Sequence, residues 1–253
     1  MQTPTREPLR RGRFERRATA FKRRAMAMVA VLALAASPTL AQALDVDTVL
    51  ANVTAAARAL QDASFLLTGK LVDTDGTTIT LEIDIEVVPQ ENLARAYIVQ
   101  PDALADNEIV LDGPAVYNYT FLTNQVMIFD ANDPDALGGL LPKGEDGASA
   151  EISLDLGAIF AGYDASLSSV EVGENGDVYV VKFANKDPKA LVLDVTARID
   201  ASDWLPRQLV FMQADGHVLA ELNAENLKID TGLDPAKVRQ LPADAEVIDN
   251  RHH

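Results

Sequence analysis

The 253-residue sequence contains no cysteine, so no disulfide stabilises the fold and no thiolate can act as a nucleophile or a metal ligand. Histidine is limited to His217, His252 and His253, which leaves no histidine cluster. There is also no Gly-x-Ser-x-Gly elbow, no phosphate-binding loop and no His-Glu-x-x-His helix. These absences argue against the common hydrolases, nucleotide-binding proteins and zinc enzymes. We therefore expect a protein that is not an enzyme and has no catalytic residue, cofactor or metal.

Basic residues are scarce after residue 43. Residues 1–43 hold nine Lys/Arg and two Asp/Glu, and the rest of the chain holds 13 Lys/Arg and 36 Asp/Glu, a net charge of −23. Such an acidic body repels nucleic acid and anionic lipid headgroups, so neither is expected as a partner. The alternative role of this charge is simply to keep a protein with an apolar core soluble.

The first 43 residues have the pattern of a signal peptide. An arginine-rich start precedes the apolar run Ala25–Ala36, and small residues follow at Thr39–Ala41 and Ala41–Ala43. The apolar run is shorter than the roughly 20 residues that a membrane-spanning helix needs, which argues against the alternative of an uncleaved anchor. We expect cleavage after Ala41 or Ala43 and export of the chain, with residues 44–253 as the mature domain.

Hydrophobic periodicity predicts one helix followed by many strands. Apolar residues at three- and four-residue steps predict a helix over 45–62, with Asp45 or Asp47 as its N-cap. Alternation from Ile79 to Val87 predicts a strand with one apolar and one charged face. Similar patterns predict strands at 93–99, 108–111, 116–119, 126–129, 167–172, 178–183, 191–199, 206–212 and 217–229.

Tight-turn dipeptides connect several of these strands. Asp-Gly or Asn-Gly occurs at 75–76, 112–113, 175–176 and 215–216. Short turns between successive strands predict an antiparallel meander, and therefore a mainly β (α+β) single domain with one large curved sheet.

A glycine-containing, apolar insertion at 133–162 interrupts the strands. It predicts loosely packed helices, which serve either as a movable lid over the sheet or as an ordinary packed corner. We assign Leu137, Leu140, Leu141, Ile159 and Phe160 to this lid. Beneath it we expect an apolar cavity for acyl chains, since the face enclosed by a curved sheet must be filled by helices or by a ligand. The candidate lining residues, each of which could instead be ordinary core, are Leu81, Ile83, Ile85, Val87, Tyr97, Val99, Val126, Ile128, Leu193 and Val195.

Two acidic patterns are weaker candidates for sites. Glu82, Asp84 and Glu86 share one face of a predicted strand, which is typical of a solvated surface. The acidic spacing at 130–135 is similar to that of a calcium loop, but Pro134 occupies a ligand position and no glycine follows at the right offset.

The order of motifs along the chain resembles the LolA family of periplasmic lipoprotein carriers. The central motifs are Pro89, Asn92-Leu93, Gln100-Pro101-Asp102, Asp112-Gly113, Val116-Tyr117-Asn118-Tyr119 and Asn124-Gln125-Val126. Asp203-Trp204-Leu205-Pro206, Ala224-Glu225-Asn226-Leu227 and Asp234-Pro235-Ala236 extend the similarity, which covers residues 45–249.

This resemblance implies an unclosed β-barrel wrapped around an N-terminal helix and a helical lid. It also implies a periplasmic carrier that moves the acyl chains of lipoproteins or lipids between a membrane donor complex and an outer-envelope acceptor, and that works as a monomer. The relative RseB implies the alternative of an envelope sensor or regulatory module. The best-known members latch the lid with an Arg immediately before the Pro of the first motif, where this chain has Val88.

Overall fold

The computed structural model describes residues 44–72, 76–133, 136, 154–173 and 176–251. The chain divides into two units, Met1–Ala43 and Leu44–His253, and only the second falls within this description. The predicted signal peptide and the predicted lid residues Leu137, Leu140 and Leu141 therefore lie outside the described residues. No helix within the described ranges is both long enough and apolar enough to span a membrane.

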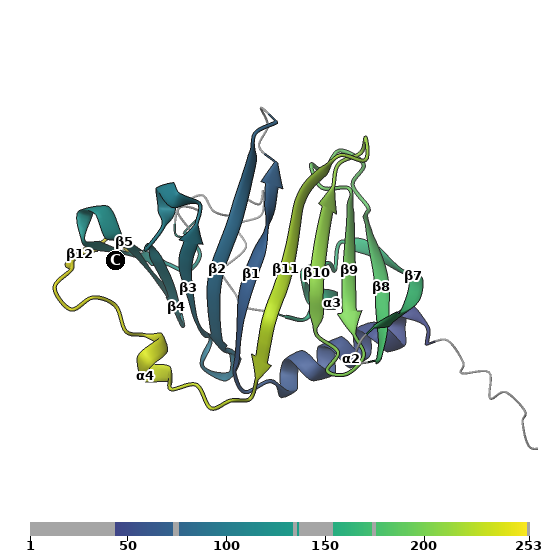
Figure 1. The fold of residues 1–253 in the computed structure, drawn as a ribbon, viewed down its shortest axis with the longest axis horizontal. Helices are drawn as coiled ribbons and strands as arrows, with labels where there is room; N and C mark the ends of the chain where they lie inside the picture. The colour runs from purple at the N-terminus through teal and green to yellow at the C-terminus, as the bar shows by residue number, and fades with distance from the viewer. Residues whose placement is uncertain (1–43, 73–75, 134–135, 137–153, 174–175, 252–253) are drawn as a thin grey trace, which may run out of the picture. The chain divides into compact units, whose positions relative to one another are not determined.

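Twelve strands form one sheet that does not close on itself (Figure 1). Its order is β12-β6-β5-β4-β3-β2-β1-β11-β10-β9-β8-β7, so β12 and β7 are the two edges. This confirms the expected mainly β, unclosed architecture. The strands are β1 Ala63–Val72, β2 Thr78–Val88, β3 Leu93–Gln100, β4 Glu108–Asp112, β5 Ala115–Thr120, β6 Gln125–Asp130, β7 Tyr163–Gly173, β8 Gly176–Asn185, β9 Asp194–Asp200, β10 Pro206–Met212, β11 Val218–Ile229 and β12 Glu246–Asp249.

Two features of the topology differ from the predicted meander. β1 pairs with β11, which is distant from it in the sequence, with Leu67 opposite Ala224. This pairing joins the two halves of the sheet. The last strand, β12, pairs parallel to β6, with Val247 opposite Val126. A parallel neighbour needs a long connection, which the segment between β11 and β12 provides.

Each Asp-Gly turn that the structure describes completely has its glycine in the left-handed region. The φ angle is 59° at Gly113 and 83° at Gly216, a conformation that costs glycine little. Two other connections are single 3₁₀ turns, η1 (Pro89–Glu91) and η3 (Phe121–Thr123). Each ends at an asparagine with positive φ, 46° at Asn92 and 51° at Asn124. A third 3₁₀ turn, η2 (Asp102–Leu104), follows β3.

The predicted N-terminal helix is present as α2 (Val46–Ala59), and the Asp45 side chain caps it by accepting a hydrogen bond from the Thr48 N–H. The buried side chains Val49 and Val53 face β8 and β9, in a cluster that includes Phe183 and Ala197. Figure 1 shows α2 lying against the half of the sheet formed by β7 to β10. We call the face of the sheet that α2 contacts the inner face, and the other the outer face.

The C-terminal segment covers part of the outer face. Its short helix α4 (Pro235–Val238) places Val238 in a buried cluster with Val88, Leu93 and Val110. β4 is consequently buried on both faces. This contact also explains why residue 88 is apolar, since it packs against α4 rather than towards the inner face.

Gly69 of β1 is a position where only glycine fits. A Cβ atom there would lie 2.2 Å from the carbonyl oxygen of Glu221 on β11. We expect Gly69→Ala to lower the free energy of unfolding by about 1–3 kcal/mol, because the strands must separate locally. Urea denaturation measures this change. Gly162→Ala is the control, since its added Cβ would meet no atom within 4 Å, and an equal loss there would contradict the interpretation.

Candidate ligand-binding cavity

An apolar cavity of about 150 Å³ lies on the inner face, between β1, β10, β11 and the segment before α3 (Leu156–Ile159). It sits where the two halves of the sheet join. Nine of its eleven lining residues are apolar, namely Phe65, Leu67, Leu154, Leu205, Pro206, Leu209, Leu222, Ala224 and Leu227, while Arg207 and Gln208 complete the wall.

The strand register explains why these side chains converge. Leu67 lies opposite Ala224, and Leu222 lies opposite Leu209, so their side chains share the inner face. The pairing of β1 with β11 shifts by one residue near Ser64 and Leu66. This is a β-bulge with Asn226 at positive φ, and it breaks the strict alternation of β11 just before Leu227.

Four predicted lining residues continue this apolar surface on β2. Val87, Ile85, Ile83 and Leu81 lie opposite Ala63, Phe65, Leu67 and Gly69. Val87 and Ala63 also belong to a buried cluster against which Leu154 and Leu227 of the cavity pack. The structure thus brings these four residues together on the cavity's face of the sheet.

Three other predicted residues lie on the opposite face. Tyr97 pairs with Asp84, and its hydroxyl donates a hydrogen bond to the Asp106 carboxylate, which raises the pKa of Tyr97. Val126 and Ile128 belong to a buried cluster with Leu241 of the C-terminal segment. They fill the core on the outer face and therefore do not contact the predicted residues of β2, which face inward.

The remaining predicted lining residues are Val99, Leu193 and Val195. Val99 lies where the β2–β3 register shifts. The Leu193 N–H donates to the Met212 carbonyl just before β9. Val195 is fully buried beneath α2 in a cluster that includes Phe160, whereas Ile159 is 49% exposed. Of the five predicted lid residues, only Ile159 and Phe160 fall within the described ranges.

The segment that closes the cavity is fastened to α2 through one carboxylate. Asp155 caps α3 by accepting hydrogen bonds from the N–H groups of Gly157 (3.0 Å) and Ala158 (3.3 Å). It also accepts a hydrogen bond from Thr54 Oγ1 of α2 (2.8 Å). Leu154, which lines the cavity, immediately precedes this residue, so the Thr54–Asp155 contact helps to hold the cavity wall in place.

We expect Thr54→Val to loosen this wall. A hydrogen bond to a charged group contributes about 1.5 kcal/mol, so amide hydrogen exchange at Ala158 and Phe160 should accelerate by about tenfold. Hydrogen-exchange NMR measures the rates. Thr68→Val is the matched control, because it removes a threonine hydroxyl that donates to Glu225 on a different part of the sheet. Equal acceleration in both variants would contradict the assignment.

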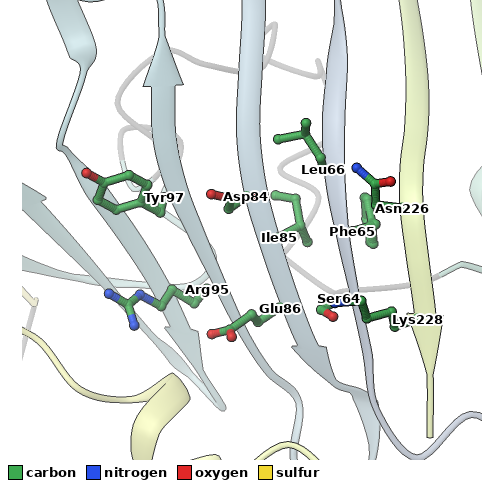
Figure 2. Close-up of a pocket in the computed structure, with 10 residues that line it drawn as sticks. All are labelled: Ser64, Phe65, Leu66, Asp84, Ile85, Glu86, Arg95, Tyr97, Asn226 and Lys228. Atoms are coloured by element: carbon green, nitrogen blue, oxygen red, sulfur yellow. The ribbon is translucent and has the colours of Figure 1, made fainter. Parts of the chain in front are cut away.

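The outer face carries a second, polar hollow of about 380 Å³ (Figure 2). Four of its side chains form a row across neighbouring strands, because each is paired with the next in the register. They are Arg95 of β3, Glu86 of β2, Ser64 of β1 and Lys228 of β11. Cations and carboxylates alternate in this hollow, so it is a poor match for an acyl chain or for an anion.

Arg95 lies on the outer face, where its Nη2 is 2.5 Å from Glu108 Oε2, whereas α2 and α3 lie on the inner face. Val88 itself is buried against Val238. Among the described residues, no group of three or more His, Asp or Glu side chains could hold a metal ion.

Comparison with solved structures identifies the fold. An uncharacterized conserved protein from Thermus thermophilus is 20% identical, with a TM-score of 0.56 over 80% of this chain and 98% of that one. MucB is 14% identical, with a TM-score of 0.50 over 80% of this chain. The chain has a LolA-like, RseB-like fold. It spans only 64% of MucB, less than two thirds of that protein's length.

The sequence comparisons found no match. No family model matches the chain, and no curated protein matches it. A putative outer membrane lipoprotein-sorting protein domain from Vibrio parahaemolyticus is 13% identical over 76% of this chain and 95% of that one. Its TM-score of 0.42 is too low to support a conclusion.

Proposed function

We propose that this protein is an exported, non-enzymatic carrier that binds the acyl chains of lipoproteins or lipids on the inner face of its sheet. The observation that carries the proposal is the cavity between β1, β10 and β11, whose walls are nearly all apolar. Removing apolar surface from water contributes about 25 cal/mol per Å², so such a cavity favours an alkyl chain over any polar ligand. The lining residues include no catalytic constellation.

The cavity is smaller than a whole acyl chain. A cavity of about 150 Å³ holds a molecule on the order of six carbon atoms. A longer chain therefore requires the wall formed by Leu154, just before α3, to move away from β1 and β11. In this proposal the closed cavity is the unloaded state, and loading costs the Thr54–Asp155 contact as well as part of the wall's packing.

The route to the periplasm rests on residues 1–43, whose pattern is that of a cleaved signal peptide. The remaining chain, residues 44–253, would act as one lipid- or lipoprotein-binding domain that receives cargo from a membrane donor and passes it to an outer-envelope acceptor. Transfer to a site with a higher affinity needs no nucleotide.

Native mass spectrometry of the protein purified from its own cell envelope tests the proposal. We expect a fraction of the protein to carry a bound mass that organic extraction releases as an acyl-bearing species. An empty protein that also fails to bind a lipid or an acylated lipoprotein in transfer assays would contradict it.

A second candidate is an envelope sensor of the RseB type. The fold similarity to MucB, with its TM-score of 0.50, favours this candidate as directly as it favours a carrier. A sensor would retain its lipid while it binds or releases a regulatory protein, whereas a carrier would deliver the lipid. A transfer assay with labelled cargo and acceptor membranes distinguishes the two functions.

A further inference from the structure

The hairpin tip between β5 and β6 displays two neighbouring apolar side chains to solvent. Phe121 is 52% exposed and Leu122 is 85% exposed. Both belong to η3, at the β12 edge of the sheet, whereas α2 and α3 pack at the β7 half. Large hydrophobic side chains that are exposed at consecutive positions are candidates for an interaction surface.

Hydrogen bonds hold this tip in place, without burial of its apolar side chains. The Phe121 N–H donates to Asn107 Oδ1 (2.9 Å), and the Asn124 N–H donates to the Phe121 carbonyl (3.1 Å). Asn124 Nδ2 donates to the Asp244 carbonyl (3.2 Å), and the Tyr119 hydroxyl donates to Asn124 Oδ1 (3.2 Å). The tip therefore presents Phe121 and Leu122 on an ordered backbone, which lowers the entropic cost of binding a partner.

The same kind of turn elsewhere in the chain has a polar residue at its middle position. In η1, the Asn92 N–H donates to the Pro89 carbonyl (3.0 Å), and Asn92 has a positive φ as Asn124 does. Gln90 stands at the position in η1 that Leu122 takes in η3. The backbone conformation thus does not require an apolar residue at 122, and the exposed leucine needs another explanation.

The surroundings of the tip are acidic. Asp106 precedes Asn107, which accepts the hydrogen bond from the Phe121 N–H, and the neighbouring C-terminal segment carries Asp244 and Glu246. The structure places some of these acids beside the tip, because Asp244 contacts Asn124 and Glu246 accepts a hydrogen bond from Gln125 (2.9 Å). An anionic membrane surface would be repelled here, whereas a basic protein surface would be attracted.

We propose that Phe121 and Leu122 dock into an apolar pocket with a basic rim on a partner protein of the transfer step. This inference rests on the proposed carrier function, to which it adds a docking contact. The apolar pair supplies the buried centre of the interface, and the acidic surroundings supply charge complementarity at its rim.

The test starts with a photoreactive phenylalanine analogue at residue 122 in the full chain, in cells that naturally make the protein. The matched control places the analogue at Val172, which is 93% exposed on β7 at the opposite edge of the sheet. We expect crosslinking to one protein from residue 122 and not from residue 172. Crosslinking only to lipid, to nothing, or equally from both sites would overturn the proposal.

The crosslinked protein is then purified, and its affinity is measured for the wild type and for the double variant Phe121→Ser, Leu122→Gln. We expect the double variant to bind at least tenfold more weakly, and the wild-type affinity to fall as salt is raised. Val170→Ser with Val172→Gln is the control double variant. Unchanged affinity in the tip variant would overturn the proposal.

Cargo binding is measured in parallel with an uncharged monoacylglycerol probe. We expect the tip variant to bind this probe as the wild type does, since Phe121 and Leu122 do not line the cavity. If the wild type fails to bind any acyl probe, the carrier function fails, while the crosslinking result still decides whether the tip is a docking site.

Discussion

Replacing Leu67 by glutamate is expected to lower the affinity for an uncharged monoacylglycerol by at least about a hundredfold at pH 8. Leu67 lines the cavity, and the lining residues around it are nearly all apolar. A carboxylate there must lose its water when an alkyl chain enters, at a cost of several kcal/mol, and about 2.7 kcal/mol already corresponds to a hundredfold. Ile83→Glu, directly opposite on β2, should act in the same direction. Fluorescence titration measures the affinity.

Thr80→Glu is the matched control for this effect. Thr80 is an exposed residue of β2 opposite Lys70, so a new carboxylate there remains hydrated and gains a cationic neighbour. We expect it to bind the probe as the wild type does. Thermal unfolding of all three variants checks that each is folded. If a folded Leu67→Glu protein binds with wild-type affinity, the ligand does not occupy this cavity.

Alternation predicts a strand most clearly where one face lies in the core and the other in water. β2 is an example, because Ile83 faces inward while Asp84 faces the outer polar hollow. β1 was not predicted, because Leu66 is an apolar residue on the outer face and interrupts the alternation. β12 was missed as well, since four residues at an edge are too few to show a period.

Alternation identifies the side chains that share one face of the sheet only where it is strict. On β4, Ile109, Val110 and Leu111 are all buried, because helices or loops cover both faces. The pattern of such a strand does not indicate which residues point inward. Val126 and Ile128 were therefore assigned to the cavity although they pack against the C-terminal segment.

The cavity itself could be predicted only in part. Leu222 and Leu227 of β11 lie inside a predicted strand, but their convergence with Phe65 depends on the pairing of β1 with β11 across more than 150 residues. The bulge at Asn226 adds a shift that no local pattern contains. The nearest available signal was the cluster of leucines in β1, which indicated an apolar segment without indicating its partner.

The β1–β11 pairing that creates the cavity ends at a group of hydrogen bonds around Asp62. This carboxylate is buried and accepts hydrogen bonds from Thr231 N–H (2.8 Å), Thr231 Oγ1 (3.0 Å) and Gly232 N–H (2.8 Å). In return, the Gln61 N–H donates to Asp230 Oδ1 (2.8 Å). Burial raises the pKa of Asp62, but the hydrogen bonds from Thr231 and Gly232 together lower it by more, so the net pKa is below its ordinary value.

Asp62→Ala is therefore expected to lower the free energy of unfolding by about 3 kcal/mol at pH 7, since it leaves buried N–H groups without their acceptor. Asp230→Ala, which removes one hydrogen bond at an exposed site, should cost about 1 kcal/mol. Because the folded-state pKa of Asp62 is depressed, its contribution is complete above the unfolded pKa of about 3.9 and is lost as the pH falls through the lower folded value. Urea denaturation between pH 7 and pH 2 should show the wild type approaching the stability of Asp62→Ala only below about pH 4. A stability difference that stays constant down to pH 2 would show that Asp62 does not act through its ionised carboxylate.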